Sequence, residues 1–411
     1  MAGRKLYAYD CGDKRTMMNR KQAGFTLVEL MVTMVIFVLV IVAASNLFTG
    51  LLNQFKQQSK IAESNIEGII GLQMLRSDIE QAGYGLPYDL DGATYSEAVD
   101  DGTTPYDDSS FNDATGNPPR AIVASNDNGF NSSDVLVVKA ANVGINAAAH
   151  KWAYIANTGA NNIMRSWTNS DGASIADENL ENGDRVIALR PVSGTNVKAL
   201  VNGGGTFYTQ YNSSLASFSD SFEPVANSYE TYIVYGINRT TDPRMPFNRA
   251  DYYVRRPATP PQRCAPGTGN LYKATVNQSD GGLTELPLLD CVADMQIVLS
   301  LDMDEDGAAG TFAAPAASLM NSSEGVTAAS VQQTLADASL LRKRLKGIRA
   351  YILAHEGQRD TFYTYPNATI NLADQDLGVL KTFDLNAVIG STYINYRWKV
   401  YTMLVQPFNL R

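Results

Sequence analysis

A single carboxylate interrupts a long apolar run near the start of the chain. Glu29 is the only charged side chain between Phe25 and Leu52, and a helix over this segment would be roughly 42 Å long, enough to cross a bilayer. A carboxylate placed there costs about 2.5 kcal/mol or more. Phe25 and Glu29 are four residues apart, so they share one helix face. A cut between Gly24 and Phe25 would create an amine one turn away, on the same helix or a neighbouring one, as a cationic partner for Glu29.

A secretory signal peptide or a simple membrane anchor is the alternative explanation of this run. Arg20 and Lys21 supply the basic flank, and the small residues 43–45 would suit a signal cleavage site. However, neither kind of segment has a use for Glu29, and the run is longer than a typical signal core. The spacing of Phe25 and Glu29 therefore favours a helix that is processed and then assembled with others.

The run Gly24-Phe-Thr-Leu-Val-Glu29 resembles the cleavage and methylation segment of type IV prepilins. The resemblance implies that a prepilin peptidase removes a leader of residues 1–24 by cutting after Gly24. It also implies that Phe25 is then N-methylated by the same processing system. During assembly, Glu29 would pair with the terminal amine of an adjacent subunit.

The same resemblance implies where the protein resides and what it contacts. The basic flank would hold the leader on the cytoplasmic side, so that the rest of the chain enters the periplasm. The subunit would wait in the inner membrane as a single-pass protein, anchored by residues 25–52, and then join other pilins and minor pilins in a pilus at the cell surface. Met17 and Met18 are alternative translation starts.

The charge of the chain argues against nucleic acid as a partner. The whole sequence has 33 basic and 42 acidic residues, and the leader holds six of the basic and two of the acidic ones. The mature chain therefore keeps 27 basic and 40 acidic residues, and such an excess of negative charge repels phosphate backbones. The one basic cluster, 342–346, is typical of a solvated surface.

Two of the three cysteines belong to the mature chain. Cys11 lies in the leader, whereas Cys264 and Cys291 remain. Two cysteines in a periplasmic or extracellular domain most often pair, so a Cys264–Cys291 disulfide is expected. It would close a loop of some 27 residues and stabilise the fold by roughly 3 kcal/mol in the chain-entropy model. The alternative is a pair of buried free thiols.

Beyond the anchor, the sequence divides into three parts. Residues 53–83 predict an amphipathic stalk helix whose apolar side packs on the head. The acidic, turn-rich segment 84–119 predicts a surface loop, because such a composition buries little. Residues 120–411 predict a β-rich head, with two lobes divided near the Pro-rich segment 256–266. The apolar stripe of the stalk consists of Ile66, Ile69, Leu72, Leu75, Ile79 and Ala82.

The head shows short β-rich runs without a regular alternation of helices and strands. This pattern disfavours a parallel doubly wound sheet and favours an α+β fold, in which the long helix packs on a large, mainly antiparallel β head. The predicted strands lie at Ser133–Lys139, Arg185–Arg190, Thr231–Asn238, Tyr252–Arg255, Met295–Leu301 and Tyr393–Gln406.

Both ends of the chain are also similar to PilW-like minor pilins. The similar segments are Leu75–Gly85, Leu283–Val298, Leu345–Leu353 and Tyr396–Tyr401. This resemblance implies a large minor pilin that acts in pilus initiation or at the tip. Two alternatives stay open: a type II secretion pseudopilin, which shares the N-terminal processing, and a pilus-tip adhesin whose specificity lies in the middle of the chain.

One short segment could bind calcium. Asp302, Asp304 and Asp306 are followed by Gly307, which matches the opening of a calcium loop. The twelfth position is Ala313, so the usual bidentate glutamate is missing. We therefore favour an acidic turn, with calcium as the alternative if a carboxylate from elsewhere, such as the acidic loop, completes the site.

The sequence gives little evidence for a catalytic site. The two histidines, His150 and His355, are far apart and lack metal-ligand spacing. The segment 203–205 is glycine-rich but lacks the lysine of a phosphate-binding loop. We expect a structural protein without a cofactor, in which both histidines are surface or packing residues.

Overall fold

The computed structural model describes residues 24–157, 162–195, 197–213, 218–226, 228, 230–315, 318–374 and 377–410. The predicted leader, apart from Gly24, and the alternative starts Met17 and Met18 lie outside the described residues. The chain forms two compact units, residues 1–56 and 57–411. Helix α1 (Leu27–Glu80) begins in the first unit and ends in the second.

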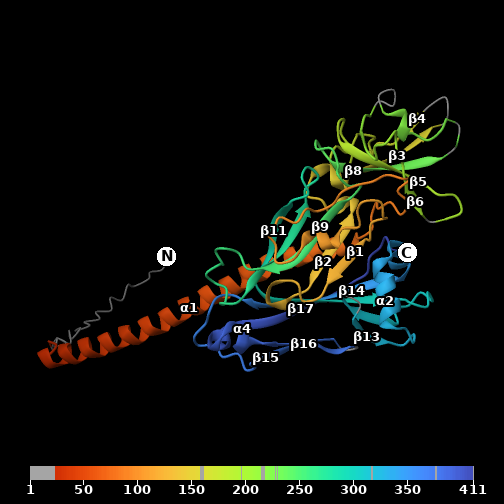
Figure 1. Ribbon diagram of the computed structural model, residues 1–411. Helices are drawn as coiled ribbons and strands as arrows, with labels where there is room; N and C mark the ends of the chain where they lie inside the picture. The colour runs from red at the N-terminus through yellow and green to blue at the C-terminus, as the bar shows by residue number, and fades with distance from the viewer. Residues whose placement is uncertain are drawn as a thin grey trace, which may run out of the picture. The chain divides into compact units, whose positions relative to one another are not determined.

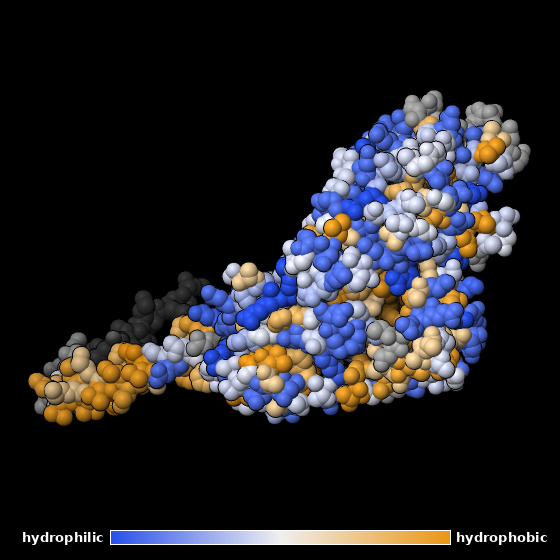
Figure 2. Space-filling view, viewed as in Figure 1, coloured by the Kyte–Doolittle hydropathy of each residue, from blue (hydrophilic) through white to orange (hydrophobic). Residues whose placement is uncertain are grey.

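The first unit presents an apolar helix with no protein around it. The described side chains of residues 24–52 are all exposed, and Figure 2 shows hydrophobic residues covering the visible face of this part of α1. An 18-residue window within the helix has a mean hydropathy of 2.9, which makes the helix long and apolar enough to cross a membrane. An apolar surface of this extent is unfavourable in water, so the helix fits a membrane anchor by its length and composition.

In the second unit, α1 packs on the head through its last turns. Leu75 and Ile79 are fully buried, but Ile66 and Ile69 are 61% and 64% exposed. The prediction that the whole stripe packs on the head is therefore wrong at its N-terminal end. Close contacts nevertheless start earlier, because a Cβ on Gly357 would lie 2.8 Å from Ile61 and one on Gly68 would lie 2.9 Å from Leu289. The backbones come closest at Gly71, where a Cβ would lie only 2.1 Å from the Leu288 carbonyl oxygen.

The helix ends three residues before the predicted boundary at residue 83. After Glu80 the chain enters a turn in which Gly83 and Gly85 have φ values of +82° and +67°. Glycine adopts this left-handed region at little cost, so it ends the helix as expected.

The head is built on a nine-stranded antiparallel sheet (Figure 1). Its central strand, β11, pairs with β10 through its first half and with β14 through its second half. The antiparallel pairing confirms the predicted α+β class. The strands are β1 (Ile122–Ser125), β2 (Val135–Ala140), β9 (Asn248–Arg255), β10 (Gly269–Val276), β11 (Leu283–Leu301), β12 (Thr311–Ala314), β13 (Ser318–Ser322), β14 (Leu345–Glu356) and β17 (Arg397–Val405).

A second sheet of six strands has a hydrophobic core of its own, which includes Ile155, Val186 and Val234. Figure 1 shows its strands β3, β4, β5 and β8 gathered at one end of the second unit. The strands are β3 (Trp152–Asn157), β4 (Asn162–Met164), β5 (Arg185–Pro191), β6 (Lys198–Leu200), β7 (Thr209–Gln210) and β8 (Thr231–Asn238).

The expected division of the head near residues 256–266 is not what the structure shows. This segment connects β9 to β10, which are antiparallel neighbours in the large sheet. Proline marks a connection here and not a lobe boundary, because two strands joined by a short loop pair directly. The second sheet comes instead from residues 152–238, between β2 and β9.

The remaining elements are short. A two-stranded sheet is formed by β15 (Thr369–Asp374) and β16 (Gly378–Asp384). The short α-helices are α2 (Ala328–Ala336), α3 (Ala338–Arg344) and α4 (Leu385–Ile389). The 3-10 helices are η1 (Asp108–Phe111), η2 (Phe130–Ser132), η3 (Ala141–Val143), η4 (Ala147–His150), η6 (Asp220–Phe222) and η8 (Ser391–Asn395), the last of which replaces the start of the strand predicted from Tyr393.

Candidate functional site

The N-terminal end of α1 is closed by a reciprocal hydrogen-bonded cap. The backbone amide and the Oγ1 hydroxyl of Thr26 each donate to Oε2 of Glu29 at 2.9 Å. In return, the Glu29 amide donates to Thr26 Oγ1 at 3.2 Å. This is a capping box, which the spacing of Thr26 and Glu29 could have revealed and which our sequence reasoning missed. Both bonds to the carboxylate use Oε2, so Oε1 is available to a further donor.

The predicted processing residues lie just before this cap. Phe25 is 83% exposed, and a Cβ added to Gly24 would meet nothing within 4 Å. The described structure therefore imposes no requirement for glycine at position 24. Glycine at this position is compatible with the predicted approach of a peptidase to the backbone. Cleavage at Gly24 and methylation of Phe25 stay predictions.

The two cysteines form the expected disulfide in the head. The Cα atoms of Cys264 and Cys291 lie 4.9 Å apart, and the bond joins the β9–β10 connection to β11. His355 lies beside this bond, and the three side chains have potential ligand atoms within 4.8 Å of one another. Because both sulfur atoms are used in the disulfide, they are not thiolate ligands for a metal.

His355 is a packing residue, as the sequence suggested. It is buried, its ring centroid lies 4.5 Å from that of Tyr396 and 5.2 Å from that of Trp398, and its Nε2 accepts a 2.8 Å hydrogen bond from the Ala265 amide. Burial lowers the pKa of His355 to about 3. The imidazole is therefore held neutral, because protonation would charge a buried group and remove its acceptor.

The three aspartates predicted as calcium ligands come together after β11. Their carboxylate oxygens lie within 4.8 Å of one another. However, Asp302 already accepts from the amides of Asp306 and Gly307 at 3.1 and 2.9 Å. Its Oδ2 also lies 3.2 Å from the Nζ of Lys346. These contacts build a closed acidic turn in which a lysine supplies the positive charge.

A carboxylate from outside the turn also lies close to it, but it does not come from the expected place. Glu324 follows β13, accepts a hydrogen bond from the Met303 amide at 3.2 Å, and accepts another from the Thr311 hydroxyl. The acidic loop 84–119 does not supply this group. Calcium binding by Asp302, Asp304 and Asp306 stays a prediction.

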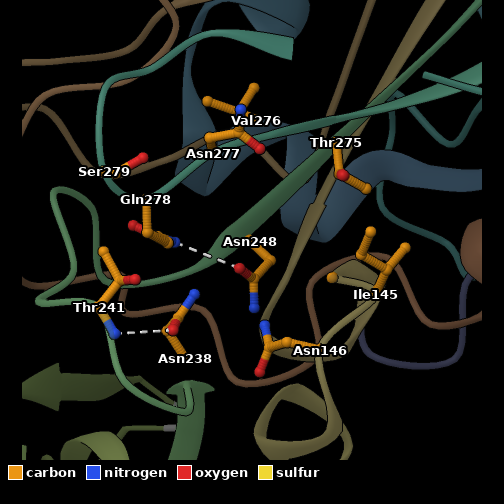
Figure 3. A pocket seen from close by; sticks show the side chains of 11 residues that line it. Ile145, Asn146, Asn238, Thr241, Asn248, Thr275, Val276, Asn277, Gln278 and Ser279 are labelled. Atoms are coloured by element: carbon orange, nitrogen blue, oxygen red, sulfur yellow. Dashed lines mark hydrogen bonds between the residues drawn. The ribbon is translucent and has the colours of Figure 1, made fainter. Parts of the chain in front are cut away.

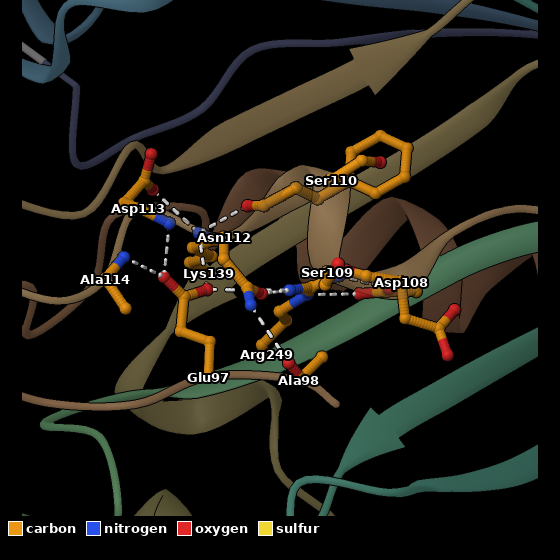
Figure 4. A network of polar contacts seen from close by, with 12 residues as sticks. Glu97, Ala98, Asp108, Ser109, Ser110, Asn112, Asp113, Ala114, Lys139 and Arg249 are labelled. Atoms are coloured by element: carbon orange, nitrogen blue, oxygen red, sulfur yellow. Dashed lines mark hydrogen bonds and ion pairs between the residues drawn. The ribbon is translucent and has the colours of Figure 1, made fainter. Parts of the chain in front are cut away.

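The acidic loop is only partly exposed: Asp89, Asp100 and Asp107 are exposed as the sequence predicted, whereas Glu97, Asp108 and Asp113 are buried. Figure 4 shows its carboxylates meeting cations of the large sheet. The Nζ of Lys139 lies 2.6 Å from Glu97 and 2.7 Å from Asp113, while Arg249 pairs with Asp251 at 2.7 Å and lies 3.5 Å from Glu97. The carboxylates are buried because β2 and β9 place two cations beneath the loop, and buried charges need such partners.

A second buried ion pair joins α1 to the same sheet. Asp78 on α1 binds the ammonium group of Lys273 on β10 and accepts a hydrogen bond from the hydroxyl of Tyr252 on β9. All three side chains are buried. Loss of one charge would leave the other without compensation, so this contact fixes the register between helix and sheet.

A polar cleft between β8, β9 and β10 is lined by amide and hydroxyl side chains (Figure 3). The amide of Asn248 donates to the Ile237 carbonyl at 3.1 Å, and that of Gln278 donates to the Phe247 carbonyl at 2.7 Å. No charged side chain lines this cleft. Its amides hold adjoining strands and loops together, which is a structural role.

A family model described as the prokaryotic N-terminal methylation motif matches residues 19–45. The match includes the basic flank, the predicted cut and Glu29, and it supports a prepilin signal of the type IV pilin kind. No curated protein and no solved structure matches the chain significantly. The finer similarity to PilW-like minor pilins therefore stays a prediction from the segments in which it was seen.

We expect calcium at about 5 mM, above the Kd of weak extracellular sites, to leave the melting temperature of the protein unchanged. The reason is that the Asp302 carboxylate already pairs with the ammonium group of Lys346 and accepts hydrogen bonds from two backbone amides, so a metal ion would have to displace these contacts. Differential scanning fluorimetry would measure this, with Asp304→Ala as the matched variant. A calcium-dependent rise that Asp304→Ala abolishes would instead establish a metal site.

The protonation of His355 should make stability fall in mild acid. Its folded-state pKa, about 3, lies below the ordinary value of 6.5, so the unfolded chain takes up the proton first. This contribution is complete above pH 6.5 and is lost as the pH falls towards 3. Between pH 7.5 and 5.0 the loss from this one group is roughly 2 kcal/mol.

Urea unfolding of the full chain in a polyoxyethylene detergent at the two pH values would measure this loss. His355→Phe should reduce the pH dependence. His150→Gln should change it less, because burial lowers the pKa of His150 in the same direction but this side chain is exposed and the shift is smaller than that of His355. An identical pH dependence in wild type and His355→Phe would show that other groups cause the loss.

Proposed function

We propose that this chain is a minor pilin, which a prepilin peptidase processes and which joins a type IV pilus at its initiation or tip. The observation that carries the proposal is the first part of α1. Its side chains are exposed and apolar, with Glu29 as the one charge up to Leu52, and a methylation-motif match covers residues 19–45. Such a surface suits a helix that first lies in lipid and later packs among like helices.

The cap geometry supports a specific role for Glu29 in assembly. Its Oε2 accepts both hydrogen bonds from Thr26 at the start of the helix, and neither of these bonds uses its Oε1. Glu29 can therefore keep its own helix capped while Oε1 accepts from the terminal amine of a neighbouring subunit. In an apolar surrounding, that charge-assisted bond would favour one axial register over others.

The size of the head supports a minor subunit over the main component of the fibre. The second unit spans residues 57–411, and a domain of this size at every position would crowd closely packed helices. The resemblance of both chain ends to PilW-like proteins agrees with this proposal.

A type II secretion pseudopilin is the alternative, since it shares the N-terminal processing. A pilus-tip adhesin, with or without calcium, is a further alternative that keeps the same helix and adds a binding role for the head. Cell-surface binding that is lost with normal fibre formation after deletion of residues 152–238, which form the second sheet and leave the strands of the large sheet in place, would favour the adhesin.

Mass spectrometry of sheared surface filaments should find this protein with an N-terminal Phe25 that carries one additional methyl group. The reason is that cleavage after Gly24 exposes this amine for methylation. The measurement tests both processing and location, because only assembled subunits shear off with filaments. A mature N-terminus near Ser45 would mean an ordinary signal peptide and would exclude the proposal.

Glu29→Ala should leave cleavage largely intact while lowering incorporation into filaments by at least tenfold. Removing the carboxylate would leave the neighbouring terminal amine buried without a counter-charge, which typically costs about 3–5 kcal/mol, more than the roughly 1.4 kcal/mol that tenfold represents. Quantitative immunoblots of sheared and cell-bound fractions would measure the ratio.

Thr26→Val is the matched control for the cap. It removes the capping hydroxyl, which costs about 1 kcal/mol of helix stability, but keeps the carboxylate. If Thr26→Val lowers incorporation as much as Glu29→Ala does, the effect comes from helix capping and the pairing role of Glu29 is wrong.

A further inference from the structure

The buried amine of Lys139 on β2 lies between two carboxylates of the segment 84–119 (Figure 4). Its Nζ is 2.6 Å from Oε2 of Glu97 and 2.7 Å from Oδ2 of Asp113. All three side chains are buried. By contrast, the buried Lys273 has one carboxylate partner, Asp78, among the described residues. A dry amine that contacts two carboxylates can react with one of them while the other carries protons.

Hydrogen bonds give the two carboxylates different surroundings. Oε1 of Glu97 accepts from the amides of Asp113 and Ala114 at 2.6 and 3.2 Å, so Oε2 is the oxygen that contacts the amine. Oδ1 of Asp113 accepts from Nε of Arg120 at 2.5 Å, and its Oδ2 accepts from the Arg120 amide at 2.8 Å. Arg120 therefore withdraws electron density from the Asp113 carboxyl group, as a group that stabilises an oxyanion does.

We propose that Lys139 and Asp113 condense to an amide, which joins β2 covalently to the segment 84–119. Lys139 supplies the nucleophile and Asp113 the carboxyl carbon. Glu97 carries protons between them, and the guanidinium of Arg120 stabilises the negative charge that forms on Oδ1. The overall change is the loss of one water molecule, and no group is oxidised or reduced.

The steps balance without any other reactant. Glu97 takes a proton from the Lys139 ammonium group and passes it to Oδ2 of Asp113. The lone pair of Nζ then forms the bond to Cγ, while one electron pair of the carbonyl moves onto Oδ1. Glu97 carries a second proton from Nζ to Oδ2, the Cγ–Oδ2 bond breaks, water leaves and the carbonyl reforms. The third N–H, which donates to the Phe111 carbonyl at 3.0 Å, remains as the amide hydrogen.

The surroundings favour this condensation. Burial raises the pKa of Asp113, but Lys139 and Arg120 lower it further, to below its usual value, so the reaction starts from an ion pair. Condensation removes one positive and one negative charge together, and Glu97 keeps the guanidinium of Arg249 at 3.5 Å. Fixed contact gives the amine a high effective concentration, and a site that excludes water disfavours hydrolysis of the amide.

The inference does not rest on the pilin role, because the bond needs only the folded head. The full chain would be purified in a polyoxyethylene detergent, its disulfide reduced and its intact mass measured. We expect a mass about 18 Da, one water molecule, below that calculated from the sequence and the N-terminus found. Trypsin should release peptide 77–120 joined to peptide 121–151, because a linked Lys139 is not cut. Tandem mass spectrometry would place the bond between Asp113 and Lys139.

Three variants test the assigned roles. Lys139→Arg should show its full calculated mass, since a guanidinium does not condense in this way. Glu97→Gln should contain at least tenfold less linked chain than wild type, because it cannot carry the protons. The matched control is Lys151→Gln, since Lys151 is also buried but has Glu181 as its carboxylate partner, at 3.2 Å. This variant should still lose one water molecule, and near-UV circular dichroism checks that each variant is folded.

An intact mass equal to the calculated one in the folded wild type would overturn the proposal and leave an ordinary buried ion pair. The same conclusion follows if Lys139→Arg also loses water, or if the linked peptides join at other residues. A folded Glu97→Gln that is linked as completely as wild type would overturn the role of Glu97 as proton carrier.

Discussion

The burial of the Asp78 carboxylate is the constraint on which the rest of the molecule depends. The residues of α1 up to Leu52 have no protein partner among the described residues, so the helix is attached to the head only through its later turns. There, Asp78 meets Lys273 and Tyr252 between fully buried Leu75 and Ile79. Removing one member of such a pair typically costs 3–5 kcal/mol, so alternative registers of helix on sheet are strongly disfavoured.

The same principle explains how a loop without strands becomes part of the core. The segment 84–119 is acidic enough to be soluble as a chain, yet Glu97 is only 1% exposed. Lys139 and Arg249 point from two neighbouring strands towards this loop and replace water as partners of its carboxylates. The loop thereby supplies carboxylate partners for two cations of the sheet, which would be unstable if they were buried without a counter-charge.

Much of the architecture was accessible from the sequence, because local patterns determine it. The motif from Gly24 to Glu29 could be identified from residue types at fixed spacing, and the disulfide from the expected compartment and the cysteine count. Of the described strands, β2, β5, β8, β9, β11 and β17 overlap predicted runs, whereas others such as β10 and β14 were missed. The errors concern contacts between distant segments. The local sequence does not show that Ile66 and Ile69 stay exposed while Leu75 and Ile79 are buried, and the residues of 84–119 do not show that cations lie beneath part of the loop. The predicted lobe boundary was wrong for a related reason, since the proline-rich segment 256–266 connects two paired strands of one sheet.

The attachment of α1 also determines how the molecule would carry mechanical load. In the filament that we propose, tension would reach the head through the last turns of α1 and enter β9 and β10 at Asp78. From there it would spread to β11, to which β10 is paired over much of its length. The bond between Cys264 and Cys291 closes one end of this arrangement covalently. Without these links, the hydrogen bonds between β9, β10 and β11 could break one after another. With them, we expect the three strands to bear the tension together.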